Sequence, residues 1–193
     1  MTSISRQSFE NVLTPLKHWS DGLDCLDFSA SLSSTILDDS DIECPAGRVM
    51  HLNASGTLDR GGSGTQMPLF LKIGKNEGSV WDSGVSSVSA KTFWWTIDST
   101  GIATCLVATG GFEVQSSEYV KTVDYAANDL LTANATGLLT NVNAVQYTNW
   151  ICGVCSKHRG GDYESTAPII PTGANADGVD VITFWTYFLP ASA

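Results

Sequence analysis

Two cysteines three positions apart, with a histidine just beyond them, have the spacing in this chain that most resembles a metal site. The run Cys152-Gly-Val-Cys155 is followed by His158. A structural zinc ion takes four Cys or His ligands, and no second pair of such residues lies nearby in the sequence. The run is strand-like, and residues three apart on a strand point to opposite faces. We therefore expect buried thiols here, with a metal site or a disulfide as the alternatives.

The other candidates for catalysis do not converge. Residues 18–21 (His-Trp-Ser-Asp) contain the residue types of a hydrolase triad, but neighbours in sequence cannot meet over one substrate. Asp21, Asp24 and Asp27 lack the glycine and the distal glutamate of a calcium-binding loop. The sequence contains no nucleophile elbow, phosphate-binding loop or His-Glu-x-x-His motif. We expect no enzymatic activity, no metal and no cofactor.

The composition favours strands and disfavours several partners. Hydrophobic residues make up 42% of the 193 residues, which is enough for a core, but charged residues make up only 16%. Helices normally expose many Glu, Lys and Arg side chains, so this chain is better suited to strands and turns. The net charge is −10. An acidic surface opposes binding to nucleic acid and to anionic membranes, so neither is an expected partner.

The ends and the cysteines indicate where the chain folds. No apolar run reaches the roughly 18 residues that span a bilayer. The first residues lack the apolar stretch of a signal peptide, which predicts synthesis and folding in a cytoplasm. The five cysteines are an odd number, so reduced thiols are the default expectation.

An internal repeat with an offset of 81 residues is the most informative pattern. Residues 46–58 (AGRVMHLNASGTL) align with residues 127–139 (ANDLLTANATGLL), and the alignment continues without a gap to residues 74 and 155. In both copies Asn-Ala-(Ser/Thr)-Gly lies between two short apolar runs, which predicts a tight hairpin turn. Both sites also match a glycosylation sequon, but turn geometry explains them. The alternative to a duplication is that hairpins reuse the same turn chemistry.

These patterns predict an all-β protein. Short strand-like runs with frequent turn signals are typical of a barrel-like or sandwich domain. We assign residues 45–193 to this domain, with two similar units at about 46–74 and 127–155. Residues 1–44 hold a cluster of acids and scattered apolar residues, which indicates an extended or partly helical arm laid on a neighbouring subunit. The alternative is an ordinary first strand pair of the same core.

Several large apolar side chains are candidates for contacts with other subunits. In strands, alternation sends one of two adjacent aromatic residues inward and the other outward, and outward aromatic residues commonly anchor protein interfaces. Core packing is the alternative for each residue. The candidates lie in the arm and in the apolar strands: Phe9, Leu13, Trp19, Leu26, Phe28, Trp94, Trp95 and Trp185.

Four phrases of the sequence resemble the head decoration, or cement, proteins of tailed bacteriophages. They are AGRVMHLNASGTLDRGGSGTQMPLFL, LVATGGFEV, YAANDLLTANATGLLTN and GVDVITFWTYFLP, and together they cover about half of the chain. The resemblance implies a β-tulip or jelly-roll type of fold. It also implies a trimer or dimer on the outer surface of the capsid, bound to the major capsid protein and stabilising the expanded head. It carries over no catalytic or cofactor residues.

Other functions fit the same composition. A minor tail, fibre-base or head-surface adhesion protein of a virion would also be β-rich, and copy number would separate it from a cement protein. Exposed tryptophans on a β scaffold would also suit a carbohydrate-binding module. An enzyme would need a pocket with convergent polar groups.

Overall fold

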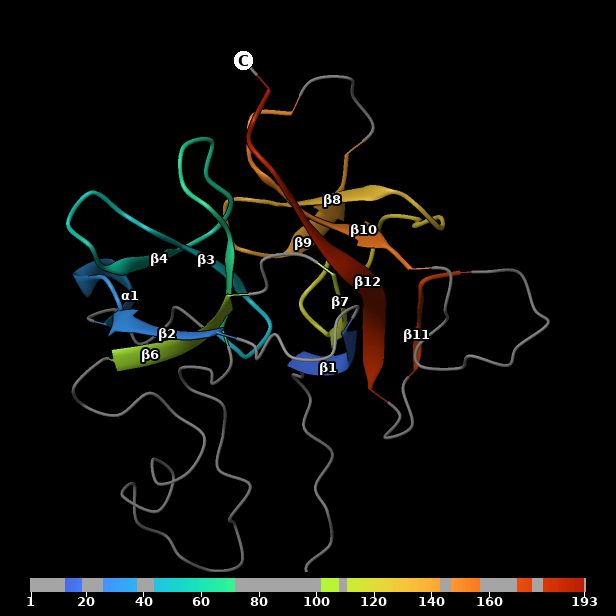
Figure 1. Ribbon diagram of the computed structural model, residues 1–193, viewed down its shortest axis with the longest axis horizontal. Coiled ribbons are helices and arrows are strands. Elements are labelled where there is room, and N and C mark those ends of the chain that lie inside the picture. The colour runs from blue at the N-terminus through green and yellow to red at the C-terminus, as the bar shows by residue number, and fades with distance from the viewer. Residues whose placement is uncertain are drawn as a thin grey trace, which may run out of the picture.

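The computed structural model describes residues 13–18, 26–37, 44–71, 102–107, 111–142, 147–156, 170–174 and 179–192. Nearly all of the regular structure in these ranges is β-strand, which confirms the predicted all-β class (Figure 1). The elements are β1 (Leu13–His18), β2 (Leu26–Ser31), α1 (Ser34–Leu37), β3 (Val49–Leu52), β4 (Leu58–Arg60), β5 (Leu69–Leu71), β6 (Ile102–Val107), β7 (Phe112–Ser116), β8 (Leu130–Ala133), β9 (Leu139–Asn141), β10 (Ile151–Cys155), β11 (Thr172–Ala174) and β12 (Asp180–Leu189).

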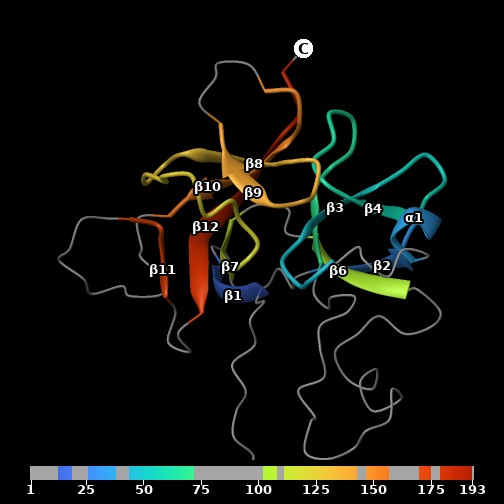
Figure 2. The ribbon, with the colours of Figure 1, turned by 180° about the vertical axis from the view of Figure 1, so that it is seen from behind.

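The strands form two antiparallel sheets. Sheet A has the order β1-β7-β12-β10-β8-β9, with β11 also paired to β12, and sheet B has the order β2-β6-β5-β3-β4. Figure 2 shows the two sheets side by side, with sheet B on the right. Isolated parallel bridges join Leu32 to Leu58 and Tyr119 to Leu139. The described strands leave both sheets open, so the expected barrel-like or sandwich form is not confirmed.

Each sheet curls around its own apolar cluster. The cluster of sheet B contains buried side chains from β3, β4, β5 and β6, including Met50, Leu58 and Leu71. The larger cluster belongs to sheet A but also takes in Val49 and Phe70 from sheet B. Successive side chains of β5 therefore pack into different clusters. Leu69 and Leu71 belong to the cluster of sheet B, and Phe70 belongs to the cluster of sheet A. This two-sided burial joins the sheets into one body.

The strand orders of the two sheets correspond. The order β2-β6-β5-β3-β4 matches β7-β12-β10-β8-β9, and every neighbouring pair in both sequences is antiparallel. The hairpin β3–β4 pairs Met50 with Arg60, and β8–β9 pairs Leu131 with Asn141, which is the same register 81 residues later.

The third strand of each unit departs from the gap-free alignment. β5 pairs Phe70 with Val49, whereas β10 pairs Val154 with Leu130, so Val154 rather than Ile151 takes the place of Phe70. The connection before the third strand accounts for the difference, because Val154 follows Asn141 by three more residues than Phe70 follows Arg60. The alignment of residues 67–74 on 148–155 is therefore wrong by three positions. The duplication itself stays a prediction.

The asparagines at the two hairpins organise the turns. Asn53 Oδ1 accepts hydrogen bonds from the backbone amides of Ser55 and Thr57, at 2.9 and 3.1 Å. Asn134 Oδ1 does the same for the amides of Thr136 and Leu138, both at 3.0 Å. The fourth turn residue is a glycine with a positive φ in each case, 75° for Gly56 and 84° for Gly137. Turn chemistry thus explains both sequons, as the sequence indicated.

Replacing these two glycines by alanine is expected to have unequal effects. Both substitutions force a side chain into a left-handed conformation, at a cost of about 1 to 2 kcal/mol. A Cβ at Gly56 would meet nothing within 4 Å, whereas one at Gly137 would lie 2.6 Å from the Val49 carbonyl oxygen. Gly137→Ala should therefore lower the free energy of unfolding clearly more than Gly56→Ala. Urea unfolding of both variants measures the difference, and equal losses would contradict the close packing at Gly137.

Part of the segment predicted as an arm lies in the sheets. β1 pairs with β7 in sheet A, and β2 pairs with β6 in sheet B. The described part of residues 1–44 is therefore built into both sheets, and the two strands do not pair with each other. An arm made of residues 1–12, 19–25 or 38–43 falls outside the described residues. The boundary at residue 44 stays a prediction.

Candidate functional site

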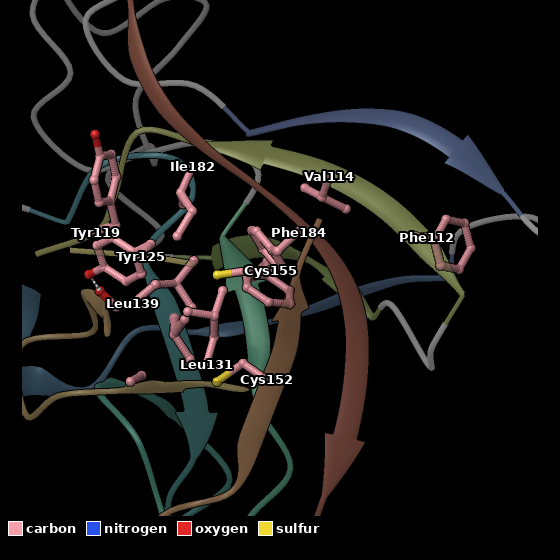
Figure 3. Close-up of a cluster of buried hydrophobic side chains, with 13 residues drawn as sticks. Phe112, Val114, Tyr119, Tyr125, Leu131, Leu139, Cys152, Cys155, Ile182 and Phe184 are labelled. Atoms are coloured by element: carbon pink, nitrogen blue, oxygen red, sulfur yellow. Dashed lines mark hydrogen bonds between the residues drawn. The ribbon is translucent and has the colours of Figure 1, made fainter. Parts of the chain in front are cut away.

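The paired cysteines lie inside the larger core. Cys152 and Cys155 are each 1% exposed, and Figure 3 shows both sulfur atoms among the apolar side chains of the cluster. Residues three apart on a regular strand would face opposite ways, so that part of the sequence argument is wrong for this strand. Both thiols nevertheless lie in the same cluster, because the start of β10 is irregular: it pairs with β8 only at Gly153 and Val154, and its register with β12 shifts by one residue between Ile151 and Gly153.

The surroundings of these thiols suppress their chemistry. Burial raises the pKa of Cys155 to about 12, with a smaller contribution from the Asp129 carboxylate, and burial alone raises the pKa of Cys152 further. A thiol reacts, or binds a metal, as the thiolate. At neutral pH both side chains are therefore protonated apolar packing groups. Buried thiols were the expectation from sequence, and the burial of Cys152 and Cys155 confirms it.

The remaining chemical candidates are separated in space or lie outside the described residues. His158 and the Ser20 and Asp21 side chains belong to the latter group. The His51 Nδ1 atom lies 3.0 Å from the Gly61 carbonyl oxygen, a contact within its own hairpin. Within the described ranges, no three His, Cys, Asp or Glu side chains gather closely enough to hold a metal ion.

Strand β7, between β1 and β12 in sheet A, carries buried polar side chains. In β7 the alternate residues Glu113 and Gln115 are as buried as their apolar neighbours. The Ser156 hydroxyl donates a short hydrogen bond to Glu113 Oε1, and Gln115 Nε2 donates to Thr183 Oγ1 at 3.4 Å. Buried polar groups need such partners, and these come from Thr183 in the adjacent strand β12 and from Ser156, just after β10. The strand's polar face is therefore part of the packing of sheet A.

A buried ion pair fastens the two sheets together. Arg48, just before β3, places Nη2 2.7 Å from Glu118 Oε2, and the two side chains are 12% and 7% exposed. Arg48 Nη1 also donates to the Thr136 carbonyl oxygen at 2.8 Å. Burial raises the pKa of Glu118, while the charge and hydrogen bond of Arg48 oppose that rise. We call this contact, with Arg48, Glu118 and Thr136, the seam.

Four of the eight predicted interface residues lie in described strands, and four lie outside the described residues. Leu13 and Leu26 lie in β1 and β2, opposite Ser116 and Val107. Phe28 is half-buried and packs against the cluster of sheet B, as the core alternative has it. Trp185 is half-buried in β12, with Glu113 and Val154 as its cross-strand neighbours. The rest lie outside the described residues: Phe9, Trp19, Trp94 and Trp95.

The end of β12 carries an outward aromatic side chain that the list of candidates omitted. Phe184 is fully buried and Trp185 is half-buried, so this adjacent pair alternates inward and outward as predicted. Tyr187 continues the outward series and is 44% exposed, whereas Phe188 is half-buried against the core. The period-2 pattern of residues 184–188 contained the signal that identifies Tyr187. An exposed tyrosine on a strand that is paired on both sides can anchor a protein contact.

Comparisons with protein-family models, with curated proteins and with solved structures found no match. No helix in the described part of the chain has the length and apolarity that crossing a bilayer requires. The site must therefore be interpreted from its own geometry. That geometry consists of inert buried thiols, a polar strand bound within its sheet, a seam between the sheets and an outward aromatic strand end.

Proposed function

We propose that this chain is an outer capsid decoration protein, which binds the major capsid protein and stabilises the expanded head of a tailed bacteriophage. Tyr187 is the observation on which the proposal depends, because it is an exposed aromatic side chain on β12, a strand that pairs with β7 on one side and β10 on the other. The acidic charge of −10 suits a surface that faces away from packaged DNA. The resemblance of four sequence phrases to cement proteins supplies the class of partner.

The mechanism in this proposal is adhesion. A protein that binds only the expanded lattice stabilises that lattice by mass action. Each contact can be weak when several copies act together, because linked binding sites gain effective concentration. The seam and the two-sided burial of β5 suit this role, since they hold the outward face in a fixed shape.

Purified chain added to expanded heads that lack it provides the test. We expect saturation at many copies per particle and an increase in the temperature at which the heads rupture. Tyr187→Ala should weaken binding about tenfold, as expected for an interface anchor. The matched control is Ile170→Ala, because Ile170 is equally exposed at 45% but lies outside β12, next to Pro171, whose carbonyl oxygen accepts from the Thr183 amide. Equal losses in both variants would contradict a Tyr187 anchor.

Two other outcomes would replace the proposal. Binding of only a handful of copies at a unique vertex would indicate a tail or fibre-base component. Glycan binding that Tyr187→Ala abolishes, with no binding to heads, would indicate a carbohydrate-binding module. Unchanged head stability at full occupancy would remove the stabilising role.

A further inference from the structure

The unit that contains β8, β9 and β10 contacts the unit that contains β3, β4 and β5 through a hairpin tip. We call these two units the two halves of the chain. The tip of the β8–β9 hairpin, Asn134–Gly137, lies against the start of β3. The Val49 amide donates to the Gly137 carbonyl oxygen at 2.9 Å, and the Gly62 amide donates to the Asn134 carbonyl oxygen at 3.1 Å. The Val49 and Phe70 side chains on the same face of sheet B are fully buried in the cluster of sheet A. We call this contact the in-chain joint.

The other half has the same donor, and there it has no partner within the described part of the chain. Val49 and Leu130 occupy corresponding positions, because the carbonyl of Val49 accepts from Gly61 and the carbonyl of Leu130 accepts from Val142. Val49 uses its amide in the in-chain joint, whereas the amide of Leu130 has no hydrogen-bond partner among the described residues. An amide that points away from its own ladder is available to another chain.

The surface around Leu130 corresponds to the buried surface around Val49. Cross-strand pairing places Val154 beside Leu130, as it places Phe70 beside Val49. Val49 and Phe70 are 0% exposed, but Leu130 and Val154 are only half-buried. On sheet B, the face with Val49 and Phe70 is buried against sheet A. The corresponding face of sheet A, with Leu130 and Val154, is thus partly exposed.

The matching tip is also exposed. The turn Asn53–Gly56 has the same internal hydrogen bonds as Asn134–Gly137. Ala54, Ser55 and Gly56 are exposed, and the space around Gly56 is open to 4 Å. In Figures 1 and 2 the β3–β4 turn lies at the outer end of sheet B, away from sheet A.

We propose that a second copy of this chain occupies this surface, with its Asn53–Gly56 tip seated at the Leu130 amide. In this contact the tip of one chain would bind the Leu130 amide of another, as the Asn134–Gly137 tip binds the Val49 amide within one chain. The Asn53–Gly56 tip and the receiving surface around Leu130 are different parts of the chain, so the association is head-to-tail. Such an association closes into a ring when the rotation from one copy to the next allows closure. This inference does not depend on the capsid role.

The electrostatics predict a weaker contact than the in-chain joint. Arg48 supports that joint by donating to the Thr136 carbonyl oxygen, but the corresponding residue in the other half is Asp129. The Asp129 carboxylate accepts from the Ala126 amide and lies 3.3 Å from Asn141 Nδ2, so it stays engaged within its own turn. We therefore expect the oligomers to dissociate when the protein is diluted.

The test compares the same substitution at corresponding positions of the two tips. Sedimentation of the full chain should show concentration-dependent oligomers. Ala54→Arg should raise the dissociation constant about tenfold or more, because it places a charged side chain in the contact. Ala135→Arg is the matched control, since Ala135 is exposed on the tip that is already seated, and it should leave the association unchanged. A monomer at all concentrations, or equal effects of the two variants, would overturn the proposal.

Two further measurements locate the contact. The Leu130 amide should become protected from hydrogen exchange as the wild-type concentration rises, and Ala54→Arg should abolish that protection. A receiving-surface variant, Val154→Glu, should also prevent oligomers. A mixture of Ala54→Arg and Val154→Glu keeps one intact junction per pair of chains, so it should form dimers that neither variant forms alone. Absence of these mixed dimers, with both variants folded, would exclude the head-to-tail arrangement.

Discussion

Replacing Arg48 by methionine is expected to lower the free energy of unfolding by about 3 to 5 kcal/mol at pH 7, the range for removing one partner of a buried ion pair. The Glu118 side chain is only 7% exposed, so water cannot replace the lost guanidinium. The Thr136 carbonyl also loses its donor. Urea unfolding followed by tryptophan fluorescence measures the loss.

The loss should depend on pH with a definite sign. Burial already raises the pKa of Glu118 above its ordinary value of 4.5, and removing Arg48 removes the main cause that opposes the rise. The folded state then binds the proton more tightly than the unfolded state, so stability falls as the pH rises from the unfolded pKa through the folded one. The deficit of Arg48→Met should therefore be smaller at pH 4 than at pH 7.

An exposed ion pair supplies the control for this prediction. Lys121 Nζ lies 3.5 Å from Asp180 Oδ2, and the side chains are 58% and 49% exposed. Exposed pairs contribute about 0 to 1 kcal/mol, so Lys121→Met should have a small effect. If Arg48→Met were no worse than Lys121→Met, or if its deficit shrank as the pH rose, the seam would not hold the sheets as we describe.

Phe184→Ala is expected to be as damaging, with a loss of about 3 to 5 kcal/mol. Phe184 is fully buried, and its ring centroid lies 5.5 Å from that of Phe70, which comes from the other sheet. The substitution therefore leaves a cavity where the two sheets meet, and neighbouring strands can fill it only in part. Thermal or urea unfolding measures the effect.

Tyr187→Ala is the control on the same strand. Tyr187 is 44% exposed, so its loss should change stability by about 0.5 kcal/mol or less. A large loss for Tyr187→Ala, or a small one for Phe184→Ala, would reverse the inward and outward assignment of β12. The same variant reports on head binding, so its folding must be established first.

The sequence predicted local structure well where chemistry acts over a few residues. The Asn-Ala-(Ser/Thr)-Gly runs predicted both hairpin turns, because asparagine and glycine have a specific conformational role there. The alternation of Phe184 and Trp185 was also predictable, since a strand has a period of two. The all-β class followed from composition and turn spacing.

Other features depend on tertiary packing and left no local signal. Nothing near Arg48 identifies Glu118 as its partner, because 70 positions separate them and the pair exists only when the sheets meet. The irregular start of β10 broke the alternation on which the argument about Cys152 and Cys155 relied. The strands β1 and β2 resembled an arm because their partners, β7 and β6, lie far along the chain.

The position of β12 in sheet A has a consequence for synthesis. β12 lies between β7 and β10, yet it is translated after both of them. All strands of sheet B have been synthesised once Val107 has left the ribosome. Sheet A, in contrast, lacks its central strand β12 until the end of synthesis. During that interval β7 and β10 keep open edges, which are the edges that recruit strands from other chains. Crowded polysomes making this protein are therefore where misassembly between nascent chains would begin.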